Sequence, residues 1–81
     1  MRAYVLINVK PGHELEIIEG KAMSAGISSL KGVVQTDVLR GSYDIIAVLE
    51  GETKTIDETI LKIRKIPNVT KTESFLAIQR D

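Results

Sequence analysis

The 81-residue chain contains no cysteine and no tryptophan, and it has a single histidine. Without cysteine, disulfides cannot stabilise the domain, and a structural zinc site of the usual Cys/His type is excluded as well. A domain of this length buries too little apolar surface to be strongly stable alone. Oligomerisation is the remaining common means of stabilisation, so we expect one domain, residues 1–81, that assembles with copies of itself.

The chain has no excess of either charge, because eleven basic residues balance eleven acidic ones and both signs are spread along it. Direct nucleic-acid binding is not expected, since it requires a basic surface that neutralises phosphates. No apolar run approaches the length of a membrane span, and the first residues lack the apolar region and cleavage site of a secretory signal. These absences predict a soluble cytoplasmic protein without a membrane partner.

Hydrophobic periodicity predicts six elements in the order β-α-β-β-α-β. Apolar, β-favouring runs predict strands at 3–9, 33–40, 43–50 and 69–79. The first helix is predicted from His13 to about Leu30, with an apolar face formed by Leu15, Ile18, Ala22 and Ala25. The glycines and serines between Gly20 and Leu30 lower helix propensity and leave open a kink or an earlier end.

The second helix is predicted to begin at Thr55-Ile56-Asp57-Glu58, which matches a capping box, and to end at Ile66-Pro67-Asn68. Its expected buried face consists of Ile56, Ile60, Leu61 and Ile63. Two right-handed crossovers then place both helices on one face of a four-stranded antiparallel sheet. The fold class is therefore α+β, with a ferredoxin-like architecture.

The strands do not alternate between apolar and polar residues as a sheet with one wet face should. In the first strand Val5 and Ile7 lie on one face and Tyr4 and Leu6 on the other, and the third strand shows the same pattern. Two helices cover only one face. The second face is expected to be buried in a face-to-face homodimer, and the alternative is a set of edge positions half-covered by loops.

The turn Gly41-Ser42-Tyr43-Asp44 is a candidate site for a small amine. Asp44 is suited to pair with a ligand ammonium, and backbone donors near Gly41 are suited to receive a carboxylate, which are the two groups of a free amino acid. The structural alternative is a hairpin in which Gly41 supplies a positive φ, Asp44 bonds to the turn backbone and Tyr43 packs.

Thr70, Thr72 and Ser74 alternate along the last strand, so their hydroxyls are expected on one face, where they could bind a polar ligand. Threonine is also an ordinary strand residue, and that explanation stays open. His13, beside Glu14 and Glu16, is the one candidate for a metal ligand, although no second ligand stands at a useful spacing. No motif indicates a catalytic triad, a phosphate-binding loop or a cofactor, so we expect no enzyme activity and no cofactor.

Three segments together resemble the effector-binding domain of Lrp/AsnC-type transcriptional regulators, also called the RAM domain. They are Ala3 to Val9 with Pro11-Gly12, the Gly41-Ser42-Tyr43-Asp44 turn, and Ile63 to Ser74. The resemblance covers nearly the whole chain. The sequence has no counterpart of the helix-turn-helix domain of these regulators, which suggests a stand-alone RAM protein. The segment Gly20 to Leu30 is also longer and richer in glycine and serine than the first helix of the family.

The resemblance implies a ferredoxin-like dimer of the α+β barrel type, with dimers that join into rings of eight or ten subunits. It implies an amino-acid-like effector bound between dimers, with site residues Gly41, Tyr43, Asp44, Thr70, Thr72 and Ser74. A stand-alone module would act by joining full-length Lrp/AsnC regulators without touching DNA. The alternatives are a purely structural oligomer, a metal-binding module at His13, and a small enzyme of the dimeric ferredoxin-like barrel type.

Overall fold

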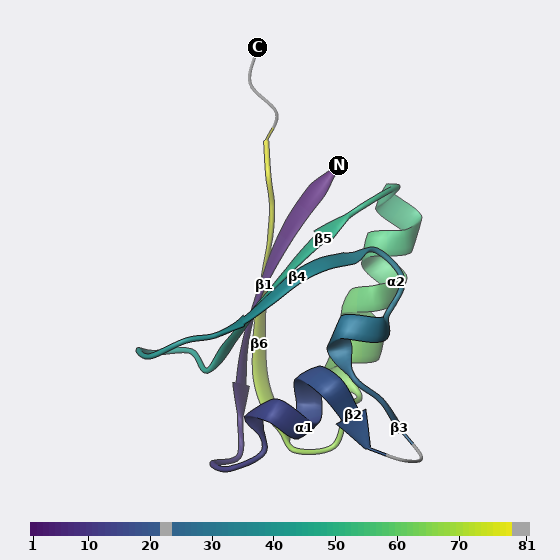
Figure 1. The fold of residues 1–81 in the computed structure, drawn as a ribbon. Coiled ribbons are helices and arrows are strands. Elements are labelled where there is room, and N and C mark those ends of the chain that lie inside the picture. Colours follow the sequence, from purple (N-terminus) through teal and green to yellow (C-terminus); the bar gives the residue numbers. More distant parts are fainter. Residues whose placement is uncertain (22–23, 79–81) are drawn as a thin grey trace.

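The computed structural model describes residues 1–21 and 24–78, and Figure 1 shows a main sheet with helices on one side and a short two-stranded ribbon, β2 and β3, apart from it. Two very short strands and a 3-10 turn are inserted after the first helix. The elements are β1 (Arg2–Val9), α1 (Glu14–Glu19), β2 (Gly20–Lys21), β3 (Ser24–Ala25), η1 (Ile27–Ser29), β4 (Val33–Val38), β5 (Ile45–Glu50), α2 (Thr53–Arg64) and β6 (Val69–Leu76).

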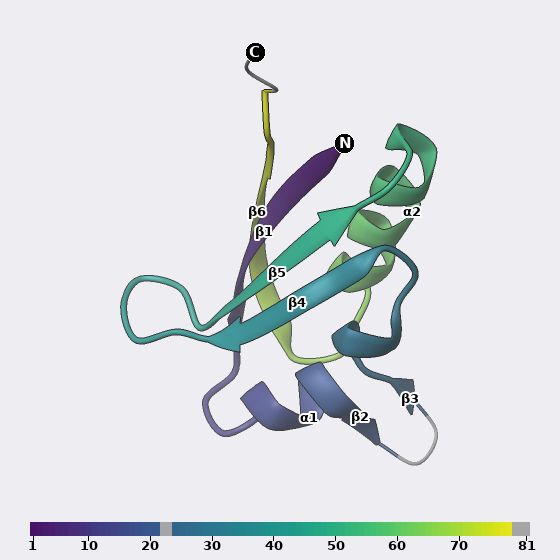
Figure 2. The ribbon, with the colours of Figure 1, turned by 45° about the horizontal axis from the view of Figure 1, so that its top comes forward.

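The main sheet has the strand order β4-β5-β1-β6, and each neighbouring pair is antiparallel. β1 is central and pairs with β5 on one side and with β6 on the other, while β4 and β6 form the two edges (Figure 2). This arrangement confirms the predicted ferredoxin-like β-α-β-β-α-β fold. No helix within residues 1–21 and 24–78 is long and apolar enough to cross a membrane.

The core lies between the sheet and the helices. Alternation along β1 directs its odd-numbered residues toward the helices, and Val5 and Ile7 are fully buried there. The register places Ile45, Ala47 and Leu49 of β5 beside them on the same face. The buried cluster comprises Ala3, Val5, Ile7, Val9, Ile17, Ile27, Ile45, Ala47, Leu49, Ile56, Ile60 and Ile63.

α2 buries Ile56, Ile60 and Ile63 as predicted, but Leu61 is 51% exposed, so its assignment to the buried face was wrong. The predicted start was wrong too. The helix begins at Thr53 with Glu52 as its N-cap, and no side chain caps it. Because the backbone N–H of Ile56 already donates to the carbonyl of Glu52, Thr55 lies inside the first turn and cannot act as the cap of a capping box.

The segment from His13 to Leu30 differs most from its prediction. α1 ends at Glu19, and Gly20 adopts a φ of +90°, which ends helical geometry. Leu15 is 65% exposed and Ile17 is buried in its place; Ala22 lies outside the described residues. A Cβ at Gly26 would collide with the backbone of Ile18 and Glu19, so the chain turns back tightly against the end of α1.

The loop between β4 and β5 is longer than predicted, because β4 ends at Val38 and β5 begins at Ile45. Figure 2 shows this loop projecting beyond the sheet, away from both helices. The N–H of Leu39 donates to the carbonyl of Asp44 at 2.8 Å and closes the base of the loop. β6 ends at Leu76, three residues before the predicted end at Gln79, which lies outside the described residues.

Candidate functional site

Asp44 stands at the base of the projecting loop and is bonded to the centre of the sheet. One of its carboxylate oxygens, Oδ2, accepts the backbone N–H of Val9 at 2.9 Å. The backbone N–H of Asp44 donates to the carbonyl of Ile7 at 3.0 Å. Asp44 therefore extends the hydrogen bonding between β1 and β5 by one residue before the start of β5, with its side chain as the acceptor. The second carboxylate oxygen, Oδ1, can accept from another donor.

Tyr43 connects the loop to β6, the strand on the other side of β1 from β5. The Nζ of Lys71 in β6 lies 5.5 Å from the centroid of the Tyr43 ring, which is within the range of a cation–π interaction. Sequence reasoning included Tyr43 in the site but missed Lys71, because the two residues meet only through the pairing of β1 with β6. Gly41, also in the predicted site, is exposed and has a φ of +154°, and no atom lies within 4 Å of the position of a Cβ there.

The three hydroxyl residues of β6 are not equivalent. Thr72 and Ser74 pair with Ile7 and Val5 of the core, so they share the helix-covered face. Thr70 falls at a β-bulge, where the register shifts between Asn8 and Val9, and it is exposed. The expectation of one regular hydroxyl ladder is thus met by Thr72 and Ser74, whereas Thr70 is the extra residue of the bulge.

The two predicted clusters lie on different faces within one chain. Lys71, which contacts Tyr43, pairs with Asn8 and so faces away from the helices, whereas Thr72 faces toward them. Asp44 and Thr72 also flank β1 on opposite sides, roughly 10 Å apart at a strand spacing of about 4.8 Å. A ligand that contacts both clusters would therefore need to bridge two chains.

His13 forms polar contacts that hold the start of α1. Its Nδ1 lies 2.9 Å from Oε2 of Glu16 and 3.2 Å from Nδ2 of Asn68, which precedes β6. A neutral Nδ1 can serve only one of these partners in each tautomer. Among the described residues no group of three or more His, Cys, Asp or Glu side chains could hold a metal ion.

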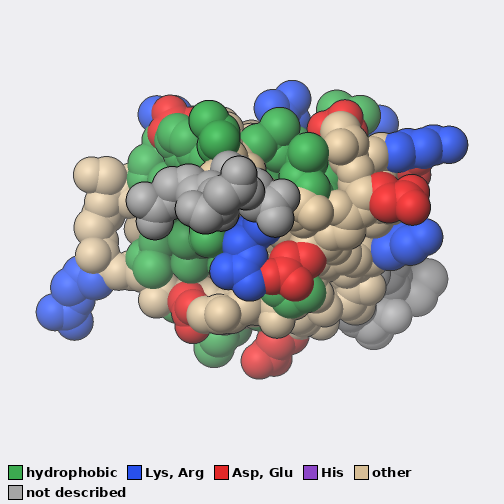
Figure 3. All heavy atoms as spheres, turned by 90° about the horizontal axis from the view of Figure 1, so that it is seen from above, with side chains coloured by type: hydrophobic (Ala, Val, Ile, Leu, Met, Phe, Trp, Pro, Cys, Tyr) green, Lys and Arg blue, Asp and Glu red, His purple; other side chains and the backbone are tan. Residues whose placement is uncertain are grey.

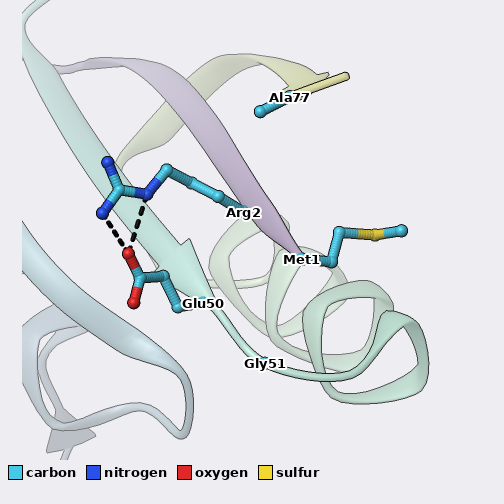
Figure 4. A pocket seen from close by; sticks show the side chains of 5 residues that line it. All are labelled: Met1, Arg2, Glu50, Gly51 and Ala77. Atoms are coloured by element: carbon cyan, nitrogen blue, oxygen red, sulfur yellow. Dashed lines mark hydrogen bonds and ion pairs between the residues drawn. The ribbon is translucent and has the colours of Figure 1, made fainter. Parts of the chain in front are cut away.

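A cavity of about 640 Å³ opens at the end of the sheet where the chain begins; its lining residues are Met1, Arg2, Glu50, Gly51 and Ala77 (Figure 4). Arg2 and Glu50 point toward each other across β1 and β5, and Nε of Arg2 donates to Oε2 of Glu50 at 2.7 Å. The Tyr4 hydroxyl and the Glu50 carboxylate raise the pKa of Arg2 above its ordinary value. Sequence reasoning missed this pair, since only the strand register brings its members together.

Figure 3 looks down on this end of the molecule and shows hydrophobic side chains clustered over one side of it, with acidic and basic side chains beside them. A second cavity, of about 360 Å³, lies between α2 and β6; its lining residues are Asp57, Ile60, Leu61, Arg64, Ser74 and Leu76. Of the six predicted effector residues, only Ser74 lines either cavity.

The sheet surface opposite the helices, called the open face below, carries five apolar side chains. They are Tyr4 and Leu6 of β1, Ile46 and Val48 of β5, and Phe75 of β6, which the register places next to one another. Phe75 is 47% exposed and the others are partly or largely buried within the single chain. The predicted apolar character of both sheet faces is therefore present in the structure.

No protein-family model matches the chain, and no curated protein matches it. Solved structures do. The hypothetical protein PHS023 from Pyrococcus horikoshii is 30% identical, with a TM-score of 0.81 over 98% of this chain and 90% of that protein. FFRP-DM1 is also 30% identical, with a TM-score of 0.81 over 95% of this chain and 97% of its own.

Longer proteins share the fold over about half of their length. AsnC from E. coli has a TM-score of 0.80 at 17% identity, covering 98% of this chain and 51% of AsnC. The transcriptional regulator NMB0573 from Neisseria meningitidis, solved as a complex with L-Met, has a TM-score of 0.74 at 12% identity, covering 96% of this chain and 49% of the regulator. Together with the two relatives at 30% identity, these matches show that the chain belongs to the Lrp/AsnC family and has the fold of its effector-binding RAM domain.

Proposed function

We propose that the protein is an oligomeric regulatory module that binds a small effector, most simply a free amino acid. The observation that carries this proposal is the fold shared over nearly the whole chain with a transcriptional regulator solved in complex with L-Met. Two proteins that share the fold are a transcriptional regulator and a feast or famine regulatory protein, which favours binding over catalysis. A module of this kind would act in the cytoplasm, by joining full-length Lrp/AsnC regulators rather than by binding DNA.

The proposed effector site combines Gly41, Tyr43 and Asp44 of one chain with the β6 hydroxyls of Thr70, Thr72 and Ser74 of another. Oδ1 of Asp44 would accept the effector ammonium, and backbone N–H groups near Gly41 would donate to its carboxylate. The projection of this loop from the body supports a site shared between chains, because it can reach a neighbour (Figure 2). Ring assembly from face-to-face dimers would bring the two clusters together.

The open face supports the proposed homodimer. Five adjacent apolar side chains on a sheet surface that no described helix covers would leave water when a second copy packs on them. Leu6→Asp places a charge in the middle of this face and is expected to reduce the mass measured by sedimentation velocity. Lys54→Asp, an exposed change on α2, is the control that should leave the mass unchanged.

The effector is tested by a thermal-shift screen of the purified protein against the common amino acids and a few divalent metals. A ligand at one hundred times its dissociation constant stabilises the folded state by about 2.7 kcal/mol, which such a screen resolves easily. Asp44→Asn is the informative variant, because an amide oxygen can still accept from Val9 N–H while the negative charge that an ammonium needs is gone. Asp44→Ala removes both the acceptor for Val9 N–H and the negative charge, so it cannot show which of the two an effector needs.

Stabilisation by particular amino acids that disappears in Asp44→Asn would support the effector site at the loop. If no amino acid shifts the melting temperature, the second candidate function, a structural oligomer without an effector, takes precedence. That candidate is favoured by the bond between Asp44 and Val9 N–H, which already gives the carboxylate a structural role. A shift with metals alone would direct attention to His13.

A further inference from the structure

β6 is an edge strand with a long regular segment. It pairs with β1 without a register shift from Lys71 to Leu76, and no described strand pairs with its outer side. The opposite edge, β4, is interrupted by a bulge between Val33 and Gln35. Bulges distort a strand and hinder further pairing, so β6 offers the more suitable edge for an additional strand.

The backbone groups available on this edge follow from one hydrogen bond. The N–H of Ala77 donates to the carbonyl of Arg2 at 2.8 Å, so Ala77 turns its backbone groups toward β1. Orientation alternates along an antiparallel strand. The N–H and C=O groups of Thr72, Ser74 and Leu76 therefore point outward, where they can form a second ladder.

The charged side chains around Thr72 are complementary to the same side chains of a second, antiparallel copy of β6. Lys71 and Glu73 flank it, and both project from the open face, since each pairs with a residue of β1 that faces away from the core. If a second β6 runs antiparallel with Thr72 opposite Thr72, each Lys71 lies opposite a Glu73. This pair is of the non-hydrogen-bonded type, in which opposing side chains approach most closely.

We propose that β6 pairs antiparallel with β6 of a second copy of this chain, with Thr72 on the two-fold axis, so that two four-stranded sheets form one continuous eight-stranded sheet. Charged residues on an edge strand usually prevent pairing. Here the order of the charges makes pairing attractive in this one register. The pairing requires neither an effector nor the open face, so it does not rest on the proposed function.

A buried hydroxyl without a partner lies beside this edge. Oγ of Ser74 is inaccessible to solvent and has no hydrogen-bond partner among the described residues. Thr70 of the second copy falls at the position opposite Ser74, but it is the extra residue of the β-bulge and is not counted as a regular partner of that hydroxyl. The cavity beside Ser74, between α2 and β6, leaves space for side chains that arrive with the added strand.

Cysteine cross-linking tests the axis directly, because the chain has no cysteine of its own. Thr72→Cys would place two thiols opposite each other at a Cα separation of about 5.5 Å, which suits a disulfide. Thr70→Cys is the matched control, since position 70 of one copy faces position 74 of the other. The two cysteines would then lie four residues apart along the paired strands. Mild oxidation should give a covalent dimer on a non-reducing gel for Thr72→Cys alone. Equal cross-linking of both variants, or none for Thr72→Cys, would overturn the proposal.

Charge reversal tests the register by an independent measurement. Lys71→Glu or Glu73→Lys turns both attractive pairs of the interface into repulsive ones, and should weaken association through the edge on the order of tenfold or more in sedimentation velocity at low salt. The double variant Lys71→Glu with Glu73→Lys restores both pairs with inverted sign and should recover wild-type association. If the single variants associate as the wild type does, or the double variant does not recover, the register is wrong.

The background Leu6→Asp separates this edge from the open face. In that background the edge is expected to hold two copies together, and adding Lys71→Glu should leave single chains. Circular dichroism identifies any variant that fails to fold. Dimers that depend on Leu6 but not on Lys71 would refute the edge pairing and leave the face-to-face dimer intact.

Discussion

The bond between Asp44 and the backbone of Val9 leads to a graded prediction for stability. Asp44→Ala removes the acceptor and leaves the N–H of Val9 without a partner at the end of a central strand. A hydrogen bond to a charged group contributes about 1.5–3 kcal/mol. Because Asp44 is partly exposed, water can replace some of that interaction, and we expect a loss of about 1–2 kcal/mol.

Asp44→Asn retains an oxygen acceptor in the same place, so its expected cost is below about 1 kcal/mol. Urea unfolding followed by circular dichroism measures both values, and a domain of this size should show a melting temperature lower by about 4–8 °C for each kcal/mol lost. Equal losses in the two variants would mean that the charge, not the acceptor, stabilises the fold. No loss in Asp44→Ala would mean that the bond to Val9 contributes nothing.

Three further substitutions test the core and its connections by the same unfolding measurement. Thr59→Val should cost about 1–2 kcal/mol, because the buried Oγ1 of Thr59 donates to the carbonyl of Lys31 at 2.6 Å, whereas Thr59→Ser should largely retain that bond. Ile63→Ala should lower the free energy of unfolding by about 2–5 kcal/mol, because Ile63 is fully buried. Leu61→Ala, on the exposed side of α2, should lower it by less than about 0.5 kcal/mol. Similar losses in the two variants would refute the observed orientation of the helix. Gly26→Ala should cost about 1–3 kcal/mol or more, since its Cβ meets backbone atoms that cannot rotate away, and a neutral result would contradict the close packing there.

Local patterns were sufficient for most of the fold. The period of two in β1 and β5 and the period near four in α2 come from backbone geometry, so they are readable wherever one side of an element is buried. Pro67 and the glycines marked turns for the same local reason. The first helix was overestimated because the apolar spacing of Leu15 and Ile18 continues past Gly20, where the backbone has already left helical geometry.

The candidate site was predictable only in part. The polar turn at Asp44 and the hydroxyls of β6 are visible as motifs, but their partners are distant in sequence. Lys71 meets Tyr43, and Val9 meets Asp44, only because β1 pairs with two other strands. The bulge at Thr70 likewise depends on how β6 matches β1, so alternation alone placed Thr70 on the same face as Thr72.

The sequence by itself determined the order of the four main strands and two helices, the apolar character of both sheet faces and the expectation of assembly, because each depends on residue type and short-range spacing. The tertiary structure alone decided which charges and hydroxyls share a face, which backbone groups remain on an open edge, and which N–H group donates to the Asp44 carboxylate. Those features depend on the register between strands, and register is set by contacts between residues far apart in the chain.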